Sequence, residues 1–226
     1  MDLEEIKDAT LAEIKGSEEM YTTQKIPETI YGNRDNYEET LEVPSGFKGI
    51  YQETFSNFGN VKEVKLPNTL LYIGEKAFEN CSSLNQCGED SGVFKIPNSV
   101  RLISSNAFRR CKALVHVVIP GTVHIEKYAF FDCGELQITI ERNVGKGAFN
   151  IDSEAFLECT SVTINAPPEL RLTAGQFTGV DGNKVTINSL SGGGKKKRRT
   201  NRRGKGKRRT RKNSRKRSRR NRKRNK

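Results

Sequence analysis

The sequence predicts a β-dominated solenoid of stacked short repeats, followed by a basic tail that has no core of its own. Two observations predict this organisation. A short phrase ending in Phe recurs through the middle of the chain, and the last 32 residues carry 22 Lys or Arg and no acid. One repeat alone cannot bury its apolar residues, so the repeats are expected to stack.

Charge divides the 226-residue chain into three regions. The net charge of +13 conceals −8 over residues 1–42, about −1 over residues 43–194 and +22 over residues 195–226. We therefore expect an acidic, mobile arm over residues 1–24 and a solenoid with an N-terminal cap over residues 25–188. A glycine linker and a disordered basic tail are expected over residues 189–226.

The recurring phrase places Phe residues at similar distances along the chain. They are Phe55, Phe78, Phe108, Phe130, Phe156 and Phe177. The intervals are 23, 30, 22, 26 and 21 residues, close to the range of about 20–29 for a leucine-rich repeat. Four of the five cysteines follow a Phe at the third position, at Cys81, Cys111, Cys133 and Cys159. Side chains at this spacing share one face of a helix, so a short helical turn is expected here.

Each Phe phrase is followed by a short run of alternating apolar and polar residues. Examples of the inward apolar pairs are Val64 with Leu66, Ile138 with Ile140, and Val162 with Ile164. A period of two predicts short strands, which stacking would join into one parallel sheet. The outward residues are then Lys65, Lys95, Val118, Thr139, Thr163 and Thr186. This face is the candidate protein-binding surface, although Thr is also a common exposed strand residue.

Two phrases, LPNTLLYIGEKAFENCSSL and IPNSVRLISSNAFRRCKAL, resemble the BspA-type leucine-rich repeat family. The similarity extends over about residues 41–187. The resemblance implies a right-handed leucine-rich-repeat solenoid, of β-dominated α/β class, used for protein recognition or adhesion. The chain differs from the family pattern at an insert over Gly88–Gly92, over Val144–Ile151, and in its first and last repeats, which lack the Cys.

The tail is the candidate polyanion-binding segment. It has no aliphatic or aromatic side chain, so it offers neither a core nor a stacking surface for bases. The expected contact residues are Lys195, Lys196, Lys197, Arg198, Arg199, Arg202, Arg203, Lys207, Arg208, Arg209, Arg211, Lys212, Arg215, Lys216, Arg217, Arg219, Arg220, Arg222, Lys223 and Arg224. Such residues would give salt-sensitive binding to nucleic acid or another polyanion without sequence readout. The tail also resembles the basic termini of large DNA virus proteins and contains segments that resemble nuclear import signals.

The sequence shows no coherent catalytic or metal-binding cluster, and no cofactor is expected. The four column cysteines are 30, 22 and 26 residues apart, whereas zinc ligands usually pair about two to four residues apart. These cysteines are expected to pack as small apolar side chains, and Cys87 is expected to be buried too. His116 and His124 have no nearby nucleophile with an orienting group, and we expect both at the surface.

Three functions stay open at this point. The first is an intracellular adaptor, nuclear or virion-associated, whose solenoid binds an unknown protein while its tail binds a polyanion. It rests on the absence of a signal-like start and of an apolar run of about 18 residues. The second is a surface or adhesin-like recognition protein, as the family resemblance implies, which would require an export route. The third and least favoured is an enzyme.

Overall fold

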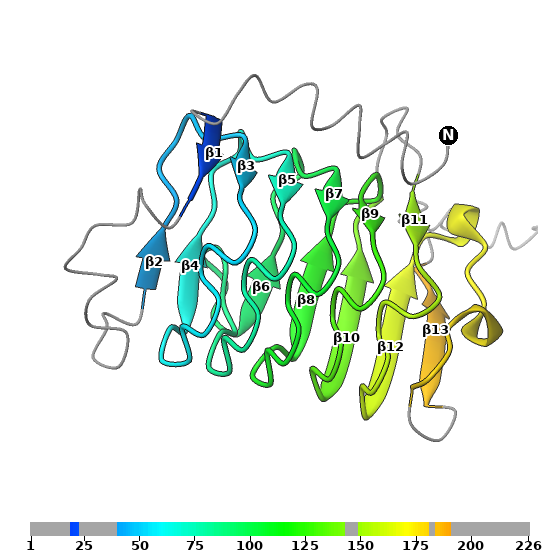
Figure 1. Ribbon diagram of the computed structural model, residues 1–226. Coiled ribbons are helices and arrows are strands. Elements are labelled where there is room, and N and C mark those ends of the chain that lie inside the picture. The colour runs from blue at the N-terminus through cyan, green and yellow to red at the C-terminus, as the bar shows by residue number, and fades with distance from the viewer. Residues whose placement is uncertain (1–18, 23–39, 143–148, 181–183, 191–226) are drawn as a thin grey trace, which may run out of the picture. The chain divides into compact units, whose positions relative to one another are not determined.

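The computed structural model describes residues 19–22, 40–142, 149–180 and 184–190 (Figure 1). Residues 191–226 lie outside these ranges, so the expected disordered tail and all of its proposed contact residues do too. Most of the expected mobile arm also lies outside them. Within the described residues the chain winds through successive coils, and the strands of neighbouring coils lie side by side (Figure 1).

The main sheet contains five parallel strands in the order β13-β12-β10-β8-β6. Their bounds are β6 Val93–Lys95, β8 His116–Ile119, β10 Glu135–Ile140, β12 Ser161–Ala166 and β13 Val185–Ser189. The strands β2 Thr40–Glu42 and β4 Glu63–Lys65 form a separate parallel pair. Apolar residues alternate into the core, in the row Phe94, Val117, Ile138, Ile164 and Ile187. The predicted short strands and their period-two burial are therefore confirmed.

A second parallel sheet forms from the apolar pair that precedes each Phe phrase. Its strands are β1 Met20–Tyr21, β3 Gly49–Ile50, β5 Tyr72–Ile73, β7 Leu102–Ile103, β9 His124–Ile125 and β11 Asn150–Ile151, joined in that order. The prediction of a single sheet is therefore wrong. A strand of two residues has one inward and one outward position, so it is too short to show an alternating pattern in the sequence. Because β1 pairs with β3, the solenoid also extends beyond the boundary expected at residue 25.

The Phe phrases form β-turns, so the prediction of helical turns is wrong. The Cys81 N–H donates to the Phe78 carbonyl oxygen, three residues earlier, over 3.2 Å. Asn80 between them has a φ of 59°, in the left-handed region that a right-handed helix excludes. The Phe78 N–H instead donates to Ala107 of the next coil over 2.8 Å. Bonds between coils thus replace the bonds within a helix. The described helices are the short 3-10 segments η3 Pro168–Leu170 and η4 Ala174–Gln176.

The core consists of columns of like residues from successive coils. The Phe78 and Phe108 rings lie 5.2 Å apart and 4° from parallel, and Phe108 and Phe130 lie 5.3 Å apart at 8°. This spacing between rings is close to the separation of about 4.8 Å between neighbouring strands. The Phe rings of successive coils therefore stack where the coils are joined by hydrogen bonds between their strands. The stack ends at Phe177, whose ring is inclined by 64° to that of Phe156. These columns fix the position of the outward residues on the main sheet.

Candidate protein-interaction surface

The outward face of the main sheet carries two rows of side chains. One row contains Lys95, Val118, Thr139, Asn165 and Asn188, and the other contains Val93, His116, Gln137, Thr163 and Thr186. The six residues expected from the sequence therefore do not form one row. The reason is the register of β10 and β12, in which Ile138 lies opposite Ile164 instead of Val162. Lys65 lies apart from both rows, on the other side of a break in the sheet.

Polar contacts link neighbouring strands across this face. His116 Nε2 lies 3.1 Å from Thr139 Oγ1, and Asn188 Nδ2 donates to Asn165 Oδ1 over 3.0 Å. Lys95 forms an ion pair with Glu141 at 3.0 Å. The two asparagines were not among the residues predicted for this face, although their repetition 23 residues apart indicates matched positions. The face thus offers mainly amides and hydroxyls.

The sheet is interrupted between β4 and β6, where the repeat carries its insert. In the described part of the chain, Gln86 forms an isolated parallel bridge to Glu63 of β4, and Cys87 forms one to Phe94 of β6. The chain then turns away at Gly88, with a φ of 110°, and returns at Gly92, with a φ of 73°. Glycine is the residue that adopts such angles without strain. The insert therefore leaves one strand position only partly filled.

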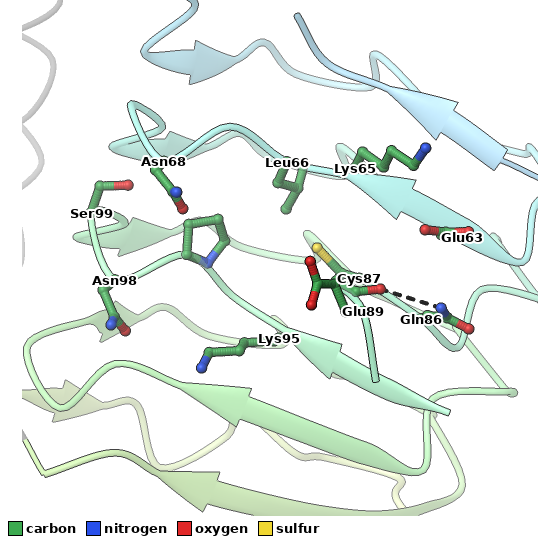
Figure 2. A pocket seen from close by; sticks show the side chains of 12 residues that line it. Glu63, Lys65, Leu66, Asn68, Gln86, Cys87, Glu89, Lys95, Asn98 and Ser99 are labelled. Carbon is green, nitrogen blue, oxygen red and sulfur yellow. Dashed lines mark hydrogen bonds between the residues drawn. The ribbon is translucent and has the colours of Figure 1, made fainter. Parts of the chain in front are cut away.

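A groove of about 970 Å³ occupies this break (Figure 2). Its walls include equivalent segments of two coils: residues 65, 66 and 68 line one wall, and residues 95 and 97–99 line the other. Cys87 lies between the walls, and Glu89 of the insert lies beside it (Figure 2). The structure therefore brings together Lys65 and Lys95, the two lysines singled out in the sequence, as the flanks of one groove.

Cys87 gives this groove little covalent chemistry. Burial raises the pKa of its thiol to about 11, although the Leu66 backbone N–H lowers it and Glu63 raises it further. A thiol with this pKa is almost fully protonated at neutral pH, and the thiolate is the reactive form. The arrangement of wall backbone, lysines and amides around Cys87 instead suits reversible binding.

The four column cysteines have a structural arrangement. Each thiol donates to the carbonyl oxygen of a Phe in the preceding coil, over 3.0–3.1 Å, in the pairs Cys81–Phe55, Cys111–Phe78, Cys133–Phe108 and Cys159–Phe130. Burial raises the pKa of Cys81 to about 12 and that of Cys159 to about 11. These protonated thiols are hydrogen-bond donors, whereas zinc binds the thiolate. Within the described ranges, no group of three or more His, Cys, Asp or Glu residues could hold a metal ion.

The two histidines occupy different surroundings. His116 is partly exposed on the main sheet, as expected, but His124 is only 5% exposed, so the prediction of a surface position is wrong for it. His124 is the outward residue of β9 and lies in register with Leu102 of β7. Leu102 belongs to a second apolar cluster with Met20 and Tyr72. The burial of His124 follows from the second sheet, which the sequence did not indicate.

The sequence matches the family model of the BspA type leucine rich repeat region in six copies, over residues 24–163 and 91–190. The chain belongs to the BspA-type leucine-rich repeat family. The family is a repeat scaffold suited to protein interaction, and the described part of this member contains no helix that meets the length and hydropathy of a membrane span. Among proteins with curated descriptions, none matches the sequence.

Two solved structures share the fold of this BspA-type chain. The T. pallidum leucine rich repeat protein TpLRR is 22% identical, with a TM-score of 0.50 over 67% of this chain and 69% of that one. The pneumococcal vaccine antigen PcpA is 17% identical, with a TM-score of 0.50 over 70% of this chain and 43% of that one. At these identities the likeness concerns the fold, and it confirms the predicted leucine-rich-repeat solenoid.

Proposed function

We propose that this BspA-type protein is a non-catalytic interaction module. Its main sheet face binds a protein, and its basic tail binds nucleic acid or another polyanion without sequence preference. The observation that supports protein binding is the polar outward face with its groove between Lys65 and Lys95. Parallel strands place such side chains about 4.8 Å apart in straight rows, a regular surface that a partner can contact over several coils.

The turn side of the solenoid offers a contrasting surface. Its charged side chains pair between neighbouring coils, as in Lys112–Asp132 and Lys127–Glu154. On the sheet face, Lys65 is exposed and forms no ion pair within the described residues. A partner can pair with Lys65 without breaking an existing ion pair, whereas the charges of the turn side are already paired, so the sheet face is the better candidate.

A photo-reactive side chain placed on each surface tests this assignment. p-Benzoylphenylalanine would replace Thr163 on the sheet face or, as the matched control, the exposed Ser82 on the turn side. Irradiation in extract of the source organism should cross-link a discrete protein through position 163 and not through position 82. Cross-linking through position 82 alone, or through neither position, would contradict protein binding by the sheet face.

The tail part of the proposal rests on charge. Its 22 basic residues without an acid can contact many phosphates, and each contact releases counterions. In an intracellular, nuclear or virion-associated adaptor, the tail would anchor the solenoid to nucleic acid. In the alternative, a surface recognition protein, it would bind acidic polymers outside the cell. Labelling of intact cells with a membrane-impermeant biotin reagent distinguishes the two, because only the surface protein would react.

A further inference from the structure

The last strand of the main sheet, β13, has a neighbouring strand on one side only within the described residues. It pairs with β12 over its full length and ends the row of strands (Figure 1). The Val162 N–H donates to the Lys184 carbonyl oxygen over 3.0 Å, and the Leu190 N–H donates to that of Ala166 over 2.8 Å. Backbone groups alternate in direction along a strand, so the even-numbered residues of this segment face β12 and the odd-numbered ones face away.

Three residues present their backbone groups at this open edge: Val185, Ile187 and Ser189. Each has one N–H and one C=O that the ladder to β12 does not use. Their side chains point inward but are less covered than their counterparts in β12. Ile187 is partly exposed where Ile164 is 0% exposed, and Ser189 is exposed where Ala166 is 3% exposed. The strand edge and the adjoining end of the core are therefore both accessible.

The sequence of β13 has none of the features that commonly protect a free edge. Proteins usually shield such a strand with a charged side chain, a proline or a bulge. From Val185 to Leu190 the chain reads Val-Thr-Ile-Asn-Ser-Leu, without a charge or a proline, and β13 pairs with β12 residue by residue. Leu190, directly after the strand, is an apolar side chain that is 37% exposed. This edge is therefore suited to pairing with a further strand.

A second copy of β13 fits the edge as an antiparallel neighbour. With the two copies of Ile187 opposite each other, each donates its N–H to the carbonyl oxygen of the other. Val185 of one copy and Ser189 of the other form a second such pair, which the two-fold axis repeats. The open backbone groups of all three odd-numbered residues are thereby used, and the two Ile187 side chains cover each other.

The outward side chains are complementary in the same register. Thr186 lies opposite Asn188 of the second copy, so a hydroxyl meets an amide. Lys184 lies opposite Leu190, and its aliphatic stem can cover the exposed leucine while its ammonium stays in water. The two copies of Lys184 lie at opposite ends of the pair, so like charges do not meet. A strand of another protein would have to match this order, whereas a second copy of the chain has it already.

We propose that the protein forms a two-fold dimer in which the two β13 strands pair antiparallel about Ile187. The five-stranded sheets of the two copies then become one continuous sheet, and their outward rows lie on one face. A partner that contacts the main sheet can then contact both copies. This inference goes beyond protein and polyanion binding, because the pairing of two copies requires neither.

Disulfide cross-linking tests the register in the full chain. Thr186→Cys and Asn188→Cys replace exposed residues, and the five native cysteines are buried. The Cα atoms of facing residues without mutual hydrogen bonds lie about 4.5 Å apart, within reach of a disulfide, whereas diagonal neighbours lie about 7–8 Å apart. A mixture of the two variants should therefore form a cross-linked dimer on mild oxidation, and each variant alone should form little. No cross-link in the mixture, or equal yields from the mixture and the single variants, would overturn the proposal.

Sedimentation velocity measures the contribution of the backbone pairing. Ser189→Pro removes an N–H that faces the open edge and keeps the bonds to β12, because proline is tolerated at such an edge position. It should weaken the dimer at least about tenfold, since each dimer loses two hydrogen bonds. Ser189→Ala keeps the N–H and should leave the dissociation constant of the dimer unchanged. Equal dissociation constants for the two variants, or an unmodified chain that stays monomeric at every concentration, would overturn the proposal.

The chain's own basic segment is the competing occupant of the edge. A chain ending at Gly194 should dimerise at least as well as the full chain, because it lacks the repulsion between two tails of +22 each. Loss of the dimer on this truncation would assign the edge to the residues after Gly194 and overturn the proposal. Cross-linking to a partner through position 163 is measured separately, so failure of the dimer and failure of the proposed protein binding are distinguishable.

Discussion

The Cys111 thiol donates a hydrogen bond over 3.0 Å to the carbonyl oxygen of Phe78, one coil earlier. That oxygen also accepts the Cys81 N–H over 3.2 Å, so thiol and amide share one acceptor. The bond joins the Phe and Cys columns between coils, and it needs a protonated sulfur. Cys111 is fully buried, and this burial raises its pKa well above the ordinary value.

Stability should therefore fall as the pH rises above about 9. In the unfolded chain a thiol ionises near its ordinary pKa, whereas Cys81 in the folded chain does so only at about 12. The unfolded state thus releases protons first, and the thiol's contribution is complete below pH 9 and lost between pH 9 and 12. Each such thiol should lower the free energy of unfolding by about 1.4 kcal/mol per pH unit in this window. Urea titrations from pH 8 to 10.5 measure the slope.

The matched control for this titration is Cys81→Ala, which should show a shallower decline than the unmodified chain. The comparison separates the thiol from the lysines and tyrosines that titrate over the same range. Identical slopes for the two proteins would mean that the buried thiols do not govern alkaline stability.

Phe108→Ala should lower the free energy of unfolding by about 3–5 kcal/mol, because it leaves a cavity in the stacked column. Phe108 lies between Phe78 and Phe130 and also meets the Phe94 ring edge-on at 5.3 Å. Phe177→Ala, at the end of the stack, should cost less, since Phe177 contacts one ring of the column and is 7% exposed. Chemical denaturation measures both, and equal losses would be inconsistent with a continuous stack.

Gly74→Ala tests the close approach of neighbouring coils at the second sheet. A Cβ at this position would lie 2.6 Å from the Ile50 carbonyl oxygen and 2.8 Å from the Tyr51 carbonyl carbon. Both are backbone atoms, so the coil itself must shift, and we expect a loss of about 1–3 kcal/mol in the free energy of unfolding. Gly175→Ala is the control, because a Cβ there meets no atom within 4 Å. A thermal melt in which the two variants unfold together would refute this packing.

The repeat columns could be predicted from the sequence because the same residue types recur at the same offsets from each Phe. Stacking then follows from the need to bury them. The second sheet could not be predicted in this way, since a pair such as Leu102 and Ile103 shows no alternation. The register of β10 also escaped prediction: Leu136, Ile138 and Ile140 are all inward, and any two of them fit the expected pair.

The groove between Lys65 and Lys95 has a signal in the sequence. Cys87 and Phe94 both suit the inward strand position of a single coil, as their shared bridge now shows. Two candidates for one position mean that the chain enters the sheet, leaves and returns. The width of the resulting opening depends on coil-to-coil hydrogen bonds, which sequence spacing alone does not contain.

The solenoid and the basic tail are expected to have separate binding activities, for a protein and for a polyanion respectively. Anisotropy titrations of a labelled DNA duplex test this division directly, with the full chain and with a chain ending at Gly194, between about 50 and 200 mM salt. The shorter chain keeps every described core residue. If about ten basic residues contact phosphates, the full chain should show a log–log salt slope near −9, and the shorter chain should show almost no binding. Equal affinity and slope for the two chains would contradict the claim.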